Sequence, residues 1–210
     1  EPELESNKIE TQNLEKQQSI NNKNYYLIDS LDEIDKWIEE AEEVGEVAVD
    51  TETTSLDPHQ ADLVGISLCS KIGKACYIPV GHKSPKCLKK DAVIKKLKKV
   101  LEDPSIKKIG QNIKFDFIVF YKCGITLSSM EDTMLMSYVL DAGKNRHNMD
   151  TLSEIHLGHK TISFKDMVGT GKKEINFSEV ELDKAKDYAA EDADITCLLY
   201  TSDAADDDVR

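Results

Sequence analysis

Three short acidic motifs follow one another along this chain, and their residue types favour metal-dependent chemistry. The first is Asp50-Thr51-Glu52, the second ends at Asp116 and the third ends at Asp192. Four carboxylates that meet in one cleft would repel one another and raise their own pKa values. Divalent cations are the usual means of holding such a group ionised, and two of them can clamp the attacking and leaving oxygens of a phosphodiester. The motifs therefore predict a two-metal nuclease.

The expected secondary structure would direct these side chains inward. Asp50 and Glu52 alternate along an expected strand, so both lie on the same face. Asp116 falls in the first turn of an expected helix, among phenylalanines where an unpartnered carboxylate would be costly. Tyr188 and Asp192 are one helical turn apart, so the tyrosine hydroxyl could orient a water beside that carboxylate.

Each motif taken singly has a simpler interpretation. Asp50 and Glu52 could be exposed acids at a strand end, and Asn112 could be a helix N-cap. Tyr188 could be a core tyrosine on the same helix as a surface acid. The ordered set, with each motif on the expected type of element, is what favours a site.

Hydrophobic periodicity predicts the elements that must position the motifs. Strands are expected at Tyr25–Ile28, Glu46–Asp50, Leu63–Ser70, Ala75–Val80 and Lys107–Ile109. A tight turn at Lys71–Lys74 makes the second to fourth of these an antiparallel meander. Helices are expected from Ser30, with Glu33 completing a capping box, and at Asp91–Leu101, Asn112–Tyr121, Asp132–Leu140, Met149–Leu157 and Glu181–Leu199. This order predicts an α/β, ribonuclease-H-like fold, with a mixed sheet flanked by helices.

Composition sets the broader frame. The 210 residues suit one domain, which we expect over 25–200, after a polar linker at 1–24 and before a disordered or foreign tail at 201–210. A net charge of −13 argues against broad, nonspecific nucleic-acid binding, although metals rather than lysines could meet a phosphate. The lysines between Lys86 and Lys108 are interpreted as a solvated helix face first and as a DNA contact second.

No apolar run suits a membrane helix, and five widely spaced cysteines suit reduced thiols, so a cytoplasmic protein is expected.

The motifs together resemble a known family. Val47-Ala-Val-Asp50-Thr-Glu52, Gly110-Gln-Asn-Ile-Lys-Phe-Asp116 and Tyr188-Ala-Ala-Glu-Asp192 are similar to the 3′–5′ proofreading exonuclease domain of bacterial DNA polymerase I. That family lies within the tyrosine-containing branch of the DEDD superfamily, and the resemblance covers roughly residues 25–199. It implies catalytic and metal-binding roles for Asp50, Glu52, Asp116 and Asp192, and a water-positioning role for Tyr188. It also implies a substrate-binding role for Thr51, Leu56, Gln111, Asn112 and Phe164.

The resemblance implies the reaction as well. Water would attack the last phosphodiester of a single-stranded DNA 3′ end and release 5′-nucleoside monophosphates. Two Mg²⁺ or Mn²⁺ ions are expected, because oxygen ligands suit hard cations. The partners would be the DNA 3′ end and a polymerase domain of the parent chain, with no membrane and a monomeric state.

Three alternatives remain at this point. A ribonuclease-D-like RNA exonuclease would use the same metal site, and only the 2′-OH of its substrate would differ. A non-catalytic module could bind a primer end, but such a module has no need of all four carboxylates. A purely structural acidic domain would leave the coincidence of the three motifs unexplained.

Overall fold

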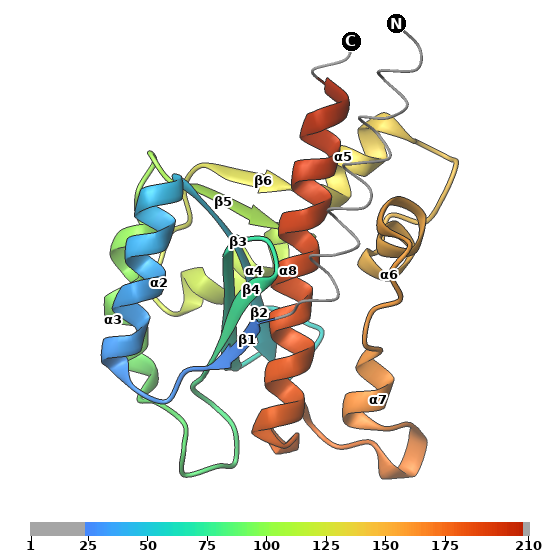
Figure 1. Ribbon diagram of the computed structural model, residues 1–210. Coiled ribbons are helices and arrows are strands. Elements are labelled where there is room, and N and C mark those ends of the chain that lie inside the picture. The colour runs from blue at the N-terminus through green and yellow to red at the C-terminus, as the bar shows by residue number, and fades with distance from the viewer. Residues whose placement is uncertain (1–23, 208–210) are drawn as a thin grey trace, which may run out of the picture.

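A six-stranded mixed sheet forms the centre of the protein (Figure 1). The computed structural model describes residues 24–207, with side chains through Thr201. The strands follow the spatial order β1-β4-β3-β2-β5-β6, with bounds β1 Asn24–Leu27, β2 Glu46–Thr53, β3 Leu63–Lys71, β4 Lys74–Pro79, β5 Lys107–Gly110 and β6 Met130–Asp132. The helices are α2 Leu31–Val44, α3 Lys90–Glu102, α4 Ile113–Lys122, α5 Thr133–Leu140, α6 Met149–Leu152, α7 Phe164–Val168 and α8 Leu182–Asp207.

The predicted antiparallel meander is present. β3 pairs antiparallel with both β2 and β4, while β2 pairs parallel with β5, and β5 pairs parallel with β6. The turn between β3 and β4 passes through Gly73, whose φ of 77° lies in the left-handed region that favours glycine. The mixed sheet and the meander confirm the fold class predicted from the sequence.

Alternation along β2 assigns its residues to two layers. Val47 and Val49 join a core that contains α2, α3 and Val119 and Phe120 of α4. Ala48 belongs to a second core, which it shares with α8. Because successive side chains on a strand point to opposite faces, Asp50 and Glu52 lie on the α8 side of the sheet and Thr51 lies on the α4 side.

Small residues bring α8 close to the middle of the sheet. Ala48, Cys69 and Ala75 on the strands pack against Ala190 and Ala193 of the helix, and all five side chains are buried. Without large side chains between them, the backbones of helix and sheet approach closely. Helix α8 runs across one face of the sheet (Figure 1) and contacts β2, β3 and β4.

Several local predictions were wrong. Ser30 is the N-cap of α2, but its side chain makes no capping bond, and Glu33 accepts instead from the Asp29 N–H at 3.3 Å. The helix expected at Met149–Leu157 changes after Leu152 into a π-helical turn over Ser153–Leu157. Strand β6 was missed because its three residues are too few to show a period.

The ends of the domain bear on the predicted boundaries. Residues 1–23 of the predicted linker lie outside the described residues, and Asn24 begins β1. Helix α8 continues through Asp207, past the end expected at Leu199. The interpretation of residues 201–210 as a disordered or foreign tail stays a prediction.

Within residues 24–207, none of the helices is both long enough and apolar enough to cross a membrane.

Candidate active site

Three of the four predicted carboxylates meet. One oxygen each from Asp50, Glu52 and Asp192 can be chosen so that all three lie within 4.8 Å of one another. Asp50 and Glu52 come from β2, and Asp192 comes from α8, which covers that face of the sheet. A cation between these oxygens would find the hard anionic ligands that Mg²⁺ and Mn²⁺ prefer.

The fourth carboxylate, Asp116, approaches from the other side of β2. It projects from the first turn of α4, and its side chain is only 3% exposed. Its Oδ1 accepts a hydrogen bond of 2.5 Å from the Thr51 hydroxyl. Asp116 is not among the three residues that share the cluster, but its charge still raises the pKa of Glu52.

Burial raises the pKa values of all four carboxylates, and mutual repulsion adds to this for Glu52, Asp116 and Asp192. Burial raises the pKa of Asp50 to about 6. Burial is also the main cause that raises the pKa of Glu52, and Asp50, Asp192 and Asp116 add repulsion. The pKa values of Asp116 and Asp192 rise for the same two reasons, burial first and the charge of Asp50 second. Such a group gains most from a divalent cation, which removes the repulsion.

Tyr188 stands one turn before Asp192 and faces the cluster. Burial, followed by the charges of Asp192, Glu52 and Asp50, raises its pKa, so the hydroxyl stays protonated. A hydrogen bond from Tyr188 lowers the pKa of Asp192, in opposition to the effect of burial. The hydroxyl is thus a fixed hydrogen-bonding group beside the carboxylates and has no proton to lose near neutral pH.

Aromatic rings form one wall of the site. Phe164, at the start of α7, stacks on Phe177 with ring centroids 6.1 Å apart and planes inclined by 6°. Both rings contact Tyr188, with centroids 6.1 Å and 5.9 Å away. Phe164 remains partly exposed, so a nucleobase could stack on it.

A cleft of about 590 Å³ contains the cluster and this wall. Its lining combines the predicted residues with others that the sequence reasoning missed: Asp50, Thr51, Glu52, Thr53, Thr54, Ser55, Leu56, Phe115, Phe164, Val168, Glu174, Ile175, Asn176, Phe177, Tyr188 and Asp192. Leu56 is 89% exposed at the mouth of this cleft. An exposed leucine beside a carboxylate cluster suits contact with a base.

Asn176 and Phe177 are the most informative of the missed residues. Asn176 donates from Nδ2 to the Thr54 carbonyl at 2.9 Å, so it ties the aromatic wall to the loop that carries Leu56. It also accepts from the Ser178 N–H, while Glu179 bonds back to the Asn176 N–H in a capping box. The Asn-x-x-Glu spacing at 176–179 is a sequence signal that could have located this turn and with it Phe177.

Two predicted substrate-binding residues lie outside the cleft lining. Gln111 is used within the protein, since its Nε2 donates to the His147 carbonyl at 2.7 Å and its Oε1 accepts from Thr133 at 2.5 Å. Asn112 is exposed in a left-handed conformation with φ 62°, and its N–H donates to Asp132. Neither residue is brought to the carboxylates, and their contact with a nucleic acid stays a prediction.

Solved nucleases share this fold. Trypanosoma brucei RNase D in complex with RNA U12 aligns with a TM-score of 0.71 at 15% identity, covering 88% of this chain and 64% of that chain. Brucella melitensis NrnC with bound Mg²⁺ aligns with a TM-score of 0.64 at 24% identity, covering 86% and 80%. At these identities the likeness establishes the fold alone. The candidate site is given by the carboxylate-lined cleft of this protein itself. The protein thus has a fold of the ribonuclease-H-like class, with a carboxylate cluster on one face of its sheet.

The sequence comparisons place the chain more narrowly. The 3′–5′ exonuclease family of DNA polymerase A type matches residues 25–202, and this chain belongs to that family. DNA polymerase I of Rhizobium leguminosarum is 44% identical over 198 residues, and that of Pseudomonas aeruginosa is 45% identical over 172 residues. These alignments cover 84% and 79% of this chain, and 19% of each relative. The resemblance inferred from the three motifs is thereby confirmed, and the chain spans about a fifth of those relatives' length.

Proposed function

We propose that this domain hydrolyses the terminal phosphodiester at the 3′ end of single-stranded DNA, with two divalent cations, and releases 5′-nucleoside monophosphates. One observation carries the proposal: Asp50, Glu52 and Asp192 converge beside Tyr188 in a cleft whose other wall is aromatic. A carboxylate cluster alone would suit many metal sites. The neighbouring tyrosine and base-sized aromatic surface suit a nucleotide terminus.

The donor set fits the proposed ions. Asp50, Glu52 and Asp192 would hold one cation, and Asp50 and Asp116 would hold the second. When bound, the cations would neutralise the carboxylates, activate water and stabilise the charge on the phosphate oxygens. The raised pKa values of the carboxylates support the proposal, because a bound cation would favour the ionised forms that burial and mutual repulsion disfavour.

The remaining residues would orient water and substrate. The Tyr188 hydroxyl stays neutral, so it would position the attacking water by hydrogen bonding and would not act as a base. Phe164 would stack on the terminal base, and Leu56 would separate that base from its neighbour. Stacking and apolar contact tolerate every base, as removal of any terminal nucleotide requires.

The larger setting is part of the same proposal. The relatives named DNA polymerase I are about five times longer than the matched segment, so we propose that this domain edits primer ends for a polymerase domain of the same chain. We further propose that it acts in the cytoplasm as a monomer.

Digestion of a 5′-labelled single-stranded DNA oligonucleotide tests the function directly. The reaction is run with Mg²⁺, with Mn²⁺ and with EDTA, beside an RNA strand of the same sequence. A metal-dependent ladder that shortens from the 3′ end, faster on DNA than on RNA, is expected. Faster digestion of RNA would transfer the assignment to a ribonuclease-D-like enzyme, and a folded sample without cleavage of either strand would refute the nuclease.

A further inference from the structure

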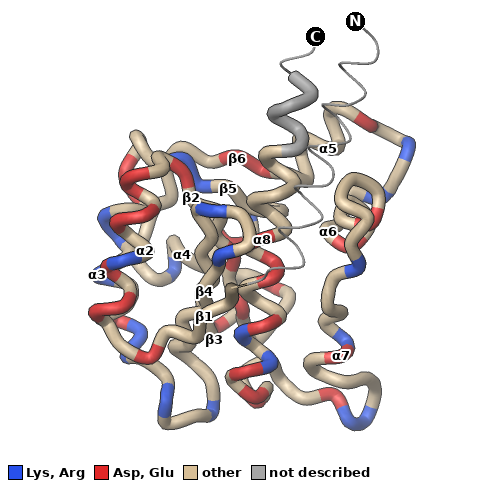
Figure 2. The backbone as a smooth tube through the Cα atoms, in the orientation of Figure 1, with Lys and Arg blue, Asp and Glu red and all other residues tan. Residues whose placement is uncertain are grey.

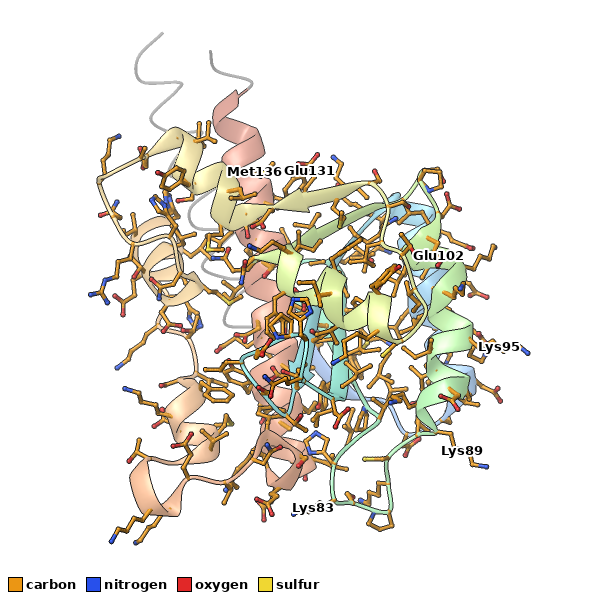
Figure 3. The ribbon with its side chains drawn as sticks, turned by 180° about the vertical axis from the view of Figure 1, so that it is seen from behind. Lys83, Lys89, Lys95, Glu102, Glu131 and Met136 are labelled. Carbon is orange, nitrogen blue, oxygen red and sulfur yellow. The ribbon has the colours of Figure 1, made fainter. Side chains whose placement is uncertain are left out.

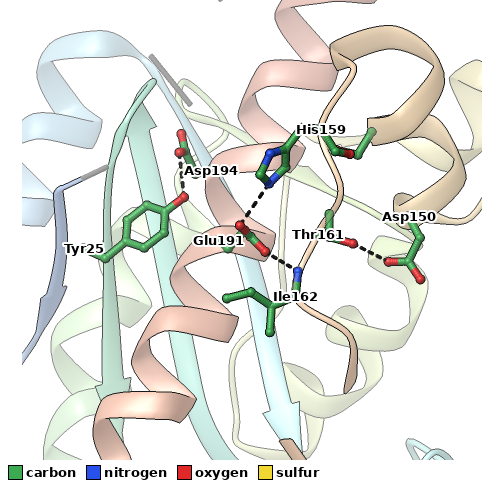
Figure 4. Close-up of polar contacts among 8 residues, drawn as sticks. Tyr25, Asp150, His159, Thr161, Ile162, Glu191 and Asp194 are labelled. Atoms are coloured by element: carbon green, nitrogen blue, oxygen red, sulfur yellow. Dashed lines mark hydrogen bonds and ion pairs between the residues drawn. The ribbon is translucent and has the colours of Figure 1, made fainter. Parts of the chain in front are cut away.

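Helix α8 carries three acidic residues in one turn, and each faces a different part of the protein. Asp192 points into the cleft, while Glu191 and Asp194 are both 1% exposed and have protein partners (Figure 4). Asp194 accepts from the Tyr25 hydroxyl at 2.9 Å and from the Gly73 N–H at 2.7 Å. It therefore fastens α8 to β1 and to the turn between β3 and β4.

Glu191 binds a different element, the irregular segment between the π-helical turn and α7. Its Oε2 accepts from the Ile162 N–H at 2.5 Å, and its Oε1 lies 3.1 Å from His159 Nε2 (Figure 4). Both carboxylate oxygens thus contact residues 159–162. A buried carboxylate needs partners of this kind, but nothing requires that they come from one short segment.

That segment leads directly into the wall of the cleft. Residue 162 is followed by Ser163, the N-cap of α7, and by Phe164, which stacks on Phe177 and contacts Tyr188. A second bond fixes the same segment, because the Thr161 hydroxyl donates to Asp150 at 2.7 Å (Figure 4). Glu191 therefore links the helix that carries Tyr188 and Asp192 to the segment that leads into Phe164.

We propose that Glu191 is a positioning residue for the 3′-terminal nucleotide, which holds residues 159–162 against α8 so that Phe164 stays in register with Tyr188 and Asp192. The identity of the nucleotide rests on the proposed function, whereas the restraint on Phe164 stands on the contacts alone. Glu191 need not touch the substrate or a cation to act in this way.

The test compares Glu191→Ala and Glu191→Gln with Asp194→Asn, a matched control that is equally buried on the same helix. All are assayed at a temperature where circular dichroism shows them folded. Mapped trypsin cleavage after Lys160 and Lys165 measures opening of the segment, and Mn²⁺ affinity measures the metal site. Steady-state kinetics on single-stranded DNA then separate KM from kcat.

In Glu191→Ala, cleavage after Lys160 and Lys165 should accelerate and KM should rise, each by about tenfold, because hydrogen bonds to a charged acceptor are lost. Affinity for Mn²⁺ should be unchanged. Glu191→Gln keeps an acceptor for the Ile162 N–H, so it should fall between the parent and the alanine variant. Asp194→Asn should match the parent in all three measurements. In a Phe164→Ala background, Glu191→Ala should raise KM no further.

Unchanged trypsin cleavage in Glu191→Ala would overturn the proposal, as would a KM effect that persists in full without Phe164. Loss of Mn²⁺ affinity would also overturn it, since Glu191 would then act on the metal site. If the alanine variant does not fold, the same comparisons on Glu191→Gln decide the question. If the parent protein has no exonuclease activity, the proposed function is refuted. The restraint on Phe164 is then still tested by comparing trypsin cleavage of the parent and the variants.

Discussion

The Thr51 hydroxyl donates a 2.5 Å hydrogen bond to the Asp116 carboxylate and so joins the second acidic motif to the first. Thr51 lies between Asp50 and Glu52 on β2, but its side chain faces α4 while theirs face α8. The middle residue of Asp-Thr-Glu therefore connects the carboxylate on one side of the strand to the pair on the other. Burial and the charge of Asp50 raise the pKa of Asp116, and the hydrogen bond from the Thr51 hydroxyl lowers it.

Replacing Thr51 with valine should weaken the site without removing any carboxylate. Valine has the same shape but no hydroxyl, so Asp116 would lose a buried partner and hold its proton more tightly. We expect a fall in kcat of about tenfold, in line with a lost hydrogen bond to a charged group. Steady-state kinetics with Mg²⁺ at neutral pH provide the measurement. Thr51→Ser, which retains the hydroxyl, is the control, and a valine variant as fast as the serine variant would contradict this role.

Metal-free stability should depend on pH through Asp50. Its pKa is about 6 in the folded protein against 3.8 ordinarily, so the native state binds the proton more tightly. A raised folded pKa contributes stability below the unfolded value, and that contribution is lost as pH rises through the folded value. Between about pH 4 and pH 7, Asp50→Asn should thus become more stable relative to the parent, by up to about 3 kcal/mol. Urea unfolding in the presence of EDTA measures the difference in the free energy of unfolding between variant and parent. Mn²⁺ should reverse this difference by stabilising only the parent. A difference that does not change with pH would exclude this role of Asp50.

The sequence predicted the arrangement of the acidic side chains correctly where local periodicity decides geometry. Alternation on β2 placed Asp50 and Glu52 on one face, and the helical repeat placed Tyr188 one turn before Asp192. The convergence of the two elements depends on which face of the sheet α8 covers. That is set by the small residues Ala48, Ala190 and Ala193, whose pairing no local pattern shows.

Other parts of the site could not be predicted because they depend on tertiary contacts. Ser30 and Glu33 have the spacing of a capping box but do not form one, whereas Asn176 and Glu179 do. Gln111 was expected to line the path of the nucleic-acid strand, and this role stays a prediction, but its amide also bonds Thr133 and the His147 carbonyl, which are distant in sequence. The spacing of a motif identifies candidate contacts, and the polar partners that folding brings together decide which of them form.

The lysines of α3 should not contact DNA. Acidic residues of α2 and lysines of α3 lie side by side along the two helices (Figure 2), and Lys96 pairs with Asp35 at 2.5 Å and Lys99 with Glu42 at 2.8 Å. Lys95 points away from the protein into solvent (Figure 3). The double substitution of Lys95 and Lys96 with alanine should leave the salt dependence of single-stranded DNA affinity unchanged. A slope reduced by roughly 1.4 would instead show that both lysines neutralise phosphates.

Removing the Tyr188 hydroxyl should separate chemistry from metal binding. Tyr188→Phe keeps the ring that packs against Phe164 and Phe177, so the cleft should keep its shape and KM should stay near that of the parent. The attacking water loses one hydrogen bond, and Asp192 loses a donor that lowers its pKa. We expect kcat to fall by roughly tenfold to a hundredfold, the range for losing one hydrogen bond to a charged group, while Mn²⁺ affinity changes little. Asp50→Ala provides the contrast, because it should lose both metal affinity and nearly all hydrolysis. Parent-like turnover in Tyr188→Phe would show that the hydroxyl does not position the water, and a loss of Mn²⁺ affinity equal to that of Asp50→Ala would assign the tyrosine to the metal site.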